Sequence, residues 1–231
     1  MRSRIVVALA ALAIVPVAAA CSGPGGTAAN KQEQSYEVTE PVTALVVDAQ
    51  AARVIVEAGD GPITVTEIHR YDDQRPTTSH QVDGQTLTLT ETGCGGDDNV
   101  RCDVEYRVRV PSATSTDITA AAGGVTVTNL AGDITVTTQA GAIEGTGLSG
   151  DQVVVTTKAG AATLEFTEAP SMLRATTDLG AIELKVPGDQ AYAVDVGTTV
   201  GASKVSVQRD DASAHKIEVK TQVGAISVAP R

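Results

Sequence analysis

From about residue 118 onward, apolar and polar residues alternate in short runs that a glycine interrupts at regular intervals. Seven and five residues before the glycine stand apolar residues, such as Val153 and Val155, and three residues before it stands a threonine. An apolar–polar alternation of period two is typical of a strand with one buried face. Each unit is therefore predicted to be a strand, a glycine corner and a second strand. The five glycines, each followed by alanine, have spacings of 19, 20, 21 and 23 residues: Gly141, Gly160, Gly180, Gly201 and Gly224.

These units predict an all-β fold of stacked coils. About 20 residues leave no room for a crossover helix, and a unit this short cannot bury a core alone. A β-solenoid with two short strands per coil and a meander of hairpins both fit. The same residue type at the same offset favours the solenoid, because stacked coils place equivalent positions about 4.8 Å apart. The threonines are predicted to form an inward column that hydrogen-bonds along itself: Thr138, Thr157, Thr177, Thr198 and Thr221.

The preceding part of the chain carries a degenerate form of the same unit. Leu45–Val56 repeats the apolar spacing without the glycine, and Ile63–Ile68 alternates again. Arg70–Gly84 is predicted to be a polar loop. Because no linker composition separates the two halves, residues 36–231 are predicted to form one domain.

The N-terminus has the features of an export signal. A positively charged start precedes an apolar run from Ile5 to Val15 and a small-residue segment that ends at Ala20, which predicts a signal peptide over residues 1–20. Cys21 follows in a context that resembles the bacterial lipobox. The resemblance implies a lipidated cysteine, and residues 21–35 would then be a flexible spacer. An uncleaved membrane anchor and cleavage by the ordinary secretory peptidase are the alternatives.

Two cysteines remain, and they bracket a polar loop. Cys94 and Cys102 lie between strand-like segments, and an exported protein reaches an oxidising compartment, so a disulfide is predicted. A reactive or metal-binding thiol pair is the alternative. Carboxylate and amide side chains in this loop could suit Ca²⁺, although turns also favour such residues. They are Asp97, Asp98, Asn99 and Asp103.

Composition and charge limit the class of partner. The formal charge of the chain is −11, and removal of a leader with two arginines leaves 15 basic against 28 acidic residues. Such a surface repels phosphate backbones, so nucleic acid is excluded as a partner. Aromatic residues make up 2% of the chain, which predicts a thin core of aliphatic side chains.

Four segments precede the Gly-Ala units: Val42–Leu45, Gly59–Gly61, Tyr106–Pro111 and Gly124–Val127. Together with those units they resemble one bacterial family, the β-strand-repeat "putative adhesin" domain. The resemblance covers roughly residues 40 to 230. It implies a right-handed solenoid-like fold without established catalytic residues.

Three carboxylates on the second strands form the candidate catalytic group: Glu144, Glu165 and Glu183. Two carboxylates about 7–8 Å apart would overlap the spacing of inverting glycosidases. Lys185 and Lys204 share this face and no aromatic platform accompanies it, so a solvated face of mixed charge is favoured. His69, His80 and His215 have no partner at zinc-ligand spacing, and no cofactor is predicted.

The sequence thus predicts a lipid-anchored extracytoplasmic module without catalytic activity. It would use its repetitive face to bind an envelope protein or a wall polymer, as an adhesin does. Two alternatives stay open. One is an accessory docking subunit of an envelope-stress or export system, and the other is a carbohydrate-active enzyme on a solenoid.

Overall fold

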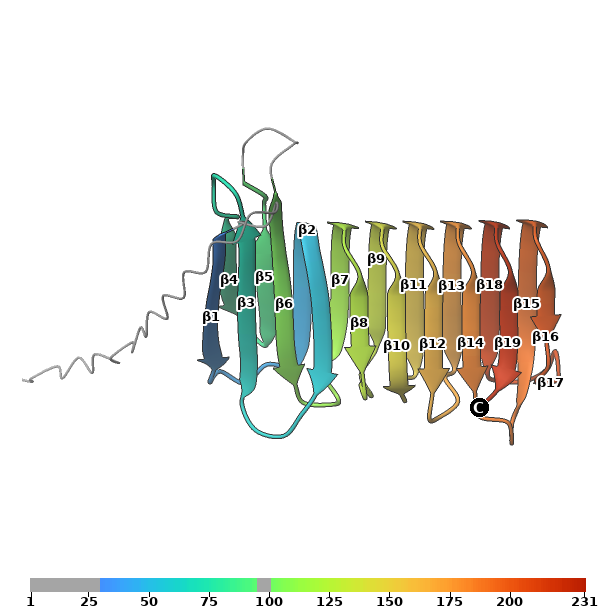
Figure 1. Ribbon diagram of the computed structural model, residues 1–231. Coiled ribbons are helices and arrows are strands. Elements are labelled where there is room, and N and C mark those ends of the chain that lie inside the picture. The colour runs from blue at the N-terminus through green and yellow to red at the C-terminus, as the bar shows by residue number, and fades with distance from the viewer. Residues whose placement is uncertain (1–29, 95–100) are drawn as a thin grey trace, which may run out of the picture.

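The computed structural model describes residues 30–94 and 101–231, which form 19 strands arranged as a rod of stacked coils (Figure 1). This confirms the predicted all-β solenoid. The signal segment, Cys21 and the loop residues 95–100 lie outside the described residues. Within the described ranges, no helix is long and apolar enough to cross a membrane.

Each regular coil contributes one strand to each of two sheets, and neighbouring coils pair in parallel. Sheet B contains, in stacking order, β7 (Ser115–Ala122), β9 (Ile134–Ala140), β11 (Gln152–Ala159), β13 (Met172–Leu179), β18 (Lys216–Val223) and β15 (Ala191–Val200). Sheet A contains β8 (Val125–Thr128), β10 (Ile143–Leu148), β12 (Ala162–Phe166), β14 (Ile182–Val186), β19 (Ile226–Pro230) and β16 (Ser203–Val205). The thin aliphatic core lies between the sheets.

The stacking order differs from the chain order at the far end. The last strands, β18 and β19, lie between the coil of β13 and β14 and the coil of β15 and β16. The coil of β15 and β16 therefore forms the end of the rod, and the short β17 (Gln208–Arg209) pairs with the start of β15. The sequence could not predict this exchange, because all units carry the same apolar pattern and any of them fits beside any other.

The glycine corners set how closely the coils stack. A Cβ on Gly180 would lie 1.9 Å from the carbonyl oxygen of Gly160 in the neighbouring coil, and the other corners show the same approach. That carbonyl oxygen accepts a hydrogen bond from the Thr177 hydroxyl at 3.1 Å. The threonine column faces inward as predicted, but four of its hydroxyls bond to glycine carbonyls and not to one another, and the buried Thr138 hydroxyl has no hydrogen-bond partner among the described residues. The equivalent bonds join Thr157 to Gly141, Thr221 to Gly180 and Thr198 to Gly224.

The N-terminal end is a mixture of coil and hairpins. The strand β2 (Ala44–Ala58) runs through both sheets and confirms the degenerate coil. At its corner, which lacks glycine, the buried Glu91 carboxylate accepts hydrogen bonds from the backbone N–H groups of Gln50 and Ala51. Antiparallel pairs close this end: β1 (Asn30–Val38) with β3 (Ile63–Tyr71), β3 with β6 (Cys102–Val110), and β4 (Thr78–Asp83) with β5 (Thr86–Glu91).

Two predicted boundaries change here. The first strand begins at Asn30, so residues 30–35 belong to the sheet and not to the spacer. The predicted loop Arg70–Gly84 contains β4, because its residues pair with β5 as the second arm of a hairpin. Every described strand pairing lies within residues 30–230, so a chain that begins at Ser22 retains the whole folded unit.

We expect Gly180→Ala to destabilise the fold strongly. The added methyl group would meet backbone and not a flexible side chain, so the expected loss in the free energy of unfolding is about 3 kcal/mol. Gly197→Ala is the matched control, since a Cβ there meets nothing within 4 Å. Urea unfolding of both variants checks this. Equal stability of the two variants would contradict the close approach at the corner.

Candidate interaction surface

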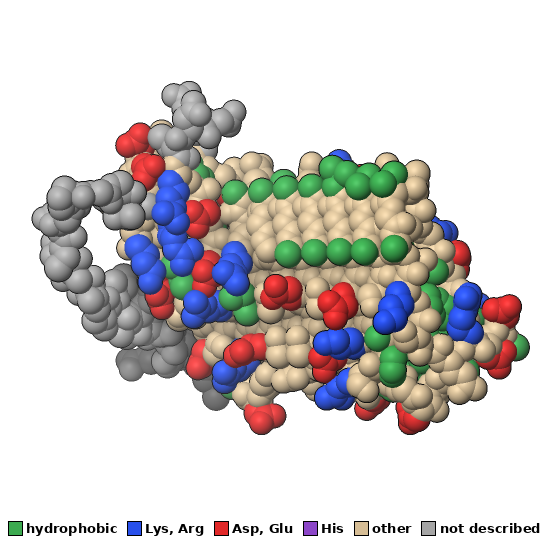
Figure 2. Space-filling model, turned by 45° about the vertical axis from the view of Figure 1, so that its right-hand side comes forward, with side chains coloured by type: hydrophobic (Ala, Val, Ile, Leu, Met, Phe, Trp, Pro, Cys, Tyr) green, Lys and Arg blue, Asp and Glu red, His purple; other side chains and the backbone are tan. Residues whose placement is uncertain are grey.

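The glycine corners produce a flat exposed strip along one edge of the rod. We call the strip the corner face, and it consists of the residues on either side of the stacked glycines. Before the glycines, in stacking order, lie Ala122, Ala140, Ala159, Leu179, Val223 and Val200, and after them lie Ala142, Ala161, Ala181, Ala225 and Ala202. All are exposed. Figure 2 shows two parallel rows of hydrophobic side chains over the regular coils, with a flat band of backbone between them.

The corner face becomes strongly apolar only at the end of the rod that is far from β1. Leu179, Val223 and Val200 are exposed by 57%, 45% and 59%, and they are the exposed large hydrophobic residues of the described chain. They are direct ladder neighbours, so their side chains form one continuous ridge. We call these three residues the distal ridge. An aliphatic ridge of this kind is typical of an interaction site and unusual on a free surface.

A polar recess of about 380 Å³ lies beside the distal ridge on the same three strands. Its rim carries Asp178 and Gln222, which hydrogen-bond to each other at 2.8 Å, and the hydroxyl-bearing Thr176 and Thr199. Gly197 supplies no side chain where the neighbouring coils have threonine or lysine, which opens the recess. The ridge and recess together place an apolar surface next to polar groups, and protein interfaces combine the same two kinds of surface.

Lys220 is the cationic group of this recess. Its ammonium group lies 2.8 Å from Glu218 and 3.3 Å from Asp195, and the hydrogen bond to Glu218 raises its pKa. Arg174 also contacts Glu218, at 2.7 Å, and the hydrogen bond from Lys220 lowers the pKa of that carboxyl group. The positive and negative charges of these residues compensate one another. The recess therefore presents hydrogen-bonding groups to a ligand more than a net electrostatic field.

The structure does not bring the three candidate carboxylates together. Glu144 and Glu183 share one ladder of sheet A, but Thr163 stands between them. Glu165 lies in the next outward ladder and pairs with Arg231 at 2.9 Å. Glu183 pairs with the neighbouring Lys185 at 3.8 Å. Carboxylates that are separated in this way, two of them paired with cations, do not form an acid and base pair for glycoside hydrolysis.

The predicted disulfide is confirmed. Cys94 and Cys102 are bonded, and Cys102 begins β6. Of the suggested Ca²⁺ ligands, residues 97–99 lie outside the described residues, and Asp103 pairs with Arg70 and Arg101. In the described part of the chain, His, Cys, Asp and Glu side chains form no group that could hold a metal ion.

The three histidines lie apart. His80 stacks on Tyr36 with ring centroids 4.2 Å apart, and His215 bonds to the carbonyl oxygen of Pro170. His69 is fully buried against Glu67, which is 1% exposed. Because Arg75 donates to Nδ1 of His69, the ring proton sits on Nε2 and points to the carboxylate.

Glu67 is the centre of a buried polar cluster between β1, β3 and β4. Its carboxylate accepts four hydrogen bonds, from Gln34 at 2.8 Å, Tyr36 at 2.9 Å, Thr78 at 2.7 Å and His69 at 3.1 Å. Burial alone would raise its pKa, but these hydrogen bonds outweigh burial and lower the pKa to about 2. Both carboxylate oxygens are hydrogen-bonded, and the cluster fills the core of the N-terminal end. It contributes structure there and no exposed reactive group.

Neither the cluster nor the ridge was predicted, although the sequence held a signal for both. Glu67 and His69 occupy the next two inward-facing positions of the strand after Ile63 and Val65. The ridge residues occupy the position directly before the glycine, where the earlier coils have alanine, as at Ala159.

Comparison with known proteins gives a family and a fold. The sequence profile described as Toastrack DUF4097 matches residues 33–229. No curated protein matches the chain. A crystal structure from Clostridium sporogenes, described as a "putative cell adhesion protein", is 14% identical with a TM-score of 0.54, and the match covers 87% of this chain and 100% of that one.

Two further solved structures match with lower TM-scores, and both come from Parabacteroides distasonis. One, described as a "putative adhesin", is 13% identical with a TM-score of 0.33 over 86% of this chain and 97% of that one. The other, described as a "putative lipid binding protein", is 16% identical with a TM-score of 0.29 over 88% and 98%. At this level of similarity neither structure indicates what this chain binds.

The buried cluster predicts a pH dependence of stability. The pKa of Glu67 is lower in the folded chain than its ordinary value of 4.5, so its carboxylate stabilises the fold above pH 4.5. That contribution, about 3 kcal/mol, is lost as the pH falls from about 4.5 to about 2. We expect Glu67→Gln to lower the urea concentration at the midpoint of unfolding at pH 7. As the pH falls toward 2, this midpoint should decrease less in the variant than in the wild-type chain. Glu144→Gln, at an exposed position, is the control. A variant of Glu67 with the wild-type pH profile would show that the cluster does not hold the carboxylate in its ionised form.

Proposed function

The chain belongs to the Toastrack DUF4097 family, and we propose that it is a lipid-anchored, extracytoplasmic module of the cell envelope without catalytic activity. It binds an envelope protein or a wall polymer through the distal ridge and the adjoining recess. The observation that carries this proposal is the position of the ridge: the large exposed aliphatic residues of the described chain gather in one ladder at the far end of the rod.

The stacked coils favour a binding function over a catalytic one. The exposed strip consists of backbone, alanine and aliphatic side chains, which supply contact area and no nucleophile or general base. The candidate carboxylates of sheet A are separated, and two of them, Glu165 and Glu183, are paired with cations. A rigid sheet also costs little conformational entropy when it binds, because its side chains are short and its backbone is already ordered.

The anchor places this surface outward from the membrane. Cys21 follows a small-residue cleavage region and precedes a spacer rich in glycine. Two acyl chains on one cysteine give stable attachment, whereas a single chain is marginal. The chain enters the rod at β1, and the distal ridge lies at the opposite end of the stack (Figure 1).

The first test measures binding to the envelope. A fluorescently labelled chain that begins at Ser22 is titrated onto isolated membranes and cell wall of the source organism. We expect saturable binding that Leu179→Asp with Val200→Asp weakens at least tenfold, because two charges would be buried in an apolar contact. Ala140→Asp with Ala159→Asp makes the same change in the same column nearer to β1 and should keep most of the binding. An equal loss in both double variants would contradict a role for the distal ridge.

The second test concerns the anchor. In cells, Cys21→Ala should release the domain from the membrane fraction or leave the leader uncleaved, because no acceptor for the lipid remains. A Cys21→Ala protein of mature size that still fractionates with membranes would contradict lipid anchoring. Binding by the purified chain that begins at Ser22 does not depend on lipidation. The binding part and the anchoring part of the proposal can therefore be contradicted independently.

A further inference from the structure

The distal end of the rod, formed by β15 and β16, has free strand edges. From residue 193 on, β15 pairs with β18 alone, and β16 pairs with β19 alone. On the free side of β15, the carbonyl oxygen of Tyr192 accepts a hydrogen bond from the N–H of Asp210 at 2.9 Å. The N–H and C=O groups of successive residues point to alternate sides of a strand, so those of Val196 and Thr198 also face the free side. No described residue pairs with them there.

The corner of the last coil also lacks its usual acceptors. At the interior corners, the N–H of the glycine and the second N–H after it donate to the next coil, as those of Gly224 and Ile226 do at 2.9 Å. The equivalent groups of the last coil belong to Gly201 and Ser203, and no described residue accepts them. Such a row of unpaired backbone groups is a template for the addition of another strand.

The core of the last coil is incompletely covered on the side next to the corner. Val196 and Val205 face the core but are only half-buried. Their ladder neighbours in the preceding coil, Val219 and Val228, are fully buried. The last coil of a solenoid exposes its core in this way unless a cap covers it.

A short cap covers the other half of the distal end. β17 lies beside the first residues of β15, and the neighbouring Val207 is 9% exposed (Figure 1). Arg209 of β17 donates from Nη2 to the carbonyl oxygen of Val194 at 2.9 Å. The contacts of the cap with β15 reach Val194, so one half of the end is capped and the half next to the glycine corner is open.

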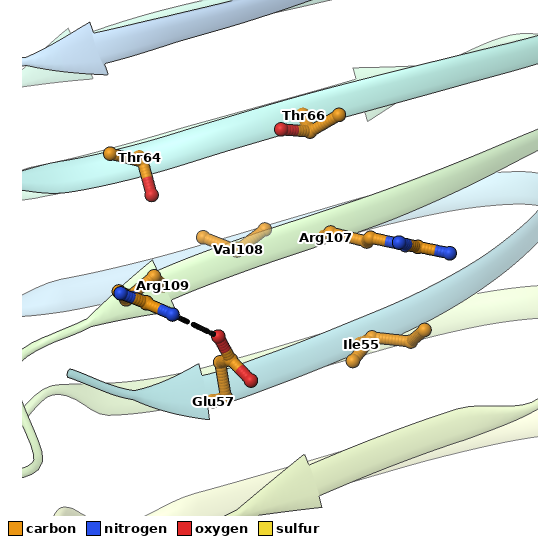
Figure 3. A pocket seen from close by; sticks show the side chains of 7 residues that line it. All are labelled: Ile55, Glu57, Thr64, Thr66, Arg107, Val108 and Arg109. Carbon is orange, nitrogen blue, oxygen red and sulfur yellow. Dashed lines mark hydrogen bonds and ion pairs between the residues drawn. The ribbon is translucent and has the colours of Figure 1, made fainter. Parts of the chain in front are cut away.

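The opposite end of the rod is closed. Tyr36 of β1 stacks on His80 of β4 with ring centroids 4.2 Å apart, and this contact joins sheet A to sheet B across the core. On the outer face of sheet A, an ion pair of 2.9 Å joins Arg109 of β6 to Glu57 of β2 (Figure 3). The N-terminal end therefore presents no open half coil to the distal end of another copy.

We propose that the distal end binds the distal end of a second copy of this chain. A cap on one half and an open edge on the other are complementary to themselves about a two-fold axis normal to the sheets, so each cap fills the open half of the other copy. β17 then pairs antiparallel with β15 of the second copy, because the N–H and C=O groups of Arg209 point away from the β15 of its own copy. A two-fold contact of this kind closes at the dimer.

The first test measures self-association of the unlipidated chain from Ser22, so neither the anchor nor an envelope partner enters it. The end of a rod is a small contact, so sedimentation velocity is measured from about 10 µM to about 1 mM, the range of weak complexes. We expect the sedimentation coefficient to rise with concentration to the value of a dimer and no further. A coefficient that stays at the monomer value, or one that rises beyond the dimer, would overturn the proposal.

Matched variants show whether the distal end makes the contact. Val205→Lys places a charge at the open end of the core and should weaken the dimer by about tenfold or more. Ser227→Lys adds the same charge at an outward position of the neighbouring β19 and should dimerise as the wild type does. Leu179→Asp should also dimerise normally, which keeps this test independent of the distal ridge. Equal dimerisation of the two lysine variants, both folded by circular dichroism, would overturn the proposal.

Amide hydrogen exchange of the wild-type chain locates the contact without any variant. Exchange is compared at about 10 µM and about 1 mM, below and within the range of dimer formation. We expect the amides of Val196, Thr198 and Arg209 to become protected at the higher concentration, because they gain acceptors in the second copy. Protection gained at β1 or along the corner face, with these three amides unchanged, would place the contact elsewhere and overturn the proposal.

Discussion

The contact between a glycine carbonyl and the threonine of the next coil sets the geometry of the whole rod. The carbonyl oxygen of Gly160 lies where a side chain on Gly180 would begin, and it accepts the hydroxyl proton of Thr177. The corner therefore needs glycine for space and threonine to pair a buried acceptor. Both residues recur in the five coils whose corners lie between Gly141 and Gly224, and these coils stack at strand spacing with a thin aliphatic core between the sheets.

This constraint also determines the surface. A corner without side chains is flat, and the residue before each glycine must point outward, so the character of the corner face depends on one position per coil. Alanine at that position leaves the first coils featureless, whereas Leu179, Val223 and Val200 make the last coils apolar. The N-terminal end is different because its corner at Gln50 and Ala51 lacks glycine and donates its backbone N–H groups to the buried Glu91 carboxylate. The two ends of the rod thus present different chemistry.

The regular part of the fold could be predicted because glycine, threonine and alternating apolar residues repeat at one period. Three features could not. The first is the position of β18 and β19 in the stack. All coils have the same apolar pattern and equivalent strand edges, so the sequence does not indicate which edge these strands pair with. The pairing of β4 with β5 depends on contacts with the rest of the end, such as the bond from Thr78 to Glu67. Finally, the outward carboxylates were expected to be near neighbours, but strand register places Thr163 between Glu144 and Glu183.

Amide hydrogen exchange at the corner glycines tests the central claim most directly. The N–H groups of Gly141, Gly160, Gly180 and Gly224 lie at an exposed edge, yet each donates to a carbonyl of the neighbouring coil at 2.9 to 3.0 Å. If the corner holds the coils together, these four amides will exchange as slowly as the central strands and will open with them. Exchange of these amides within minutes, while the strands stay protected, would show that the corners fray independently and would contradict the account.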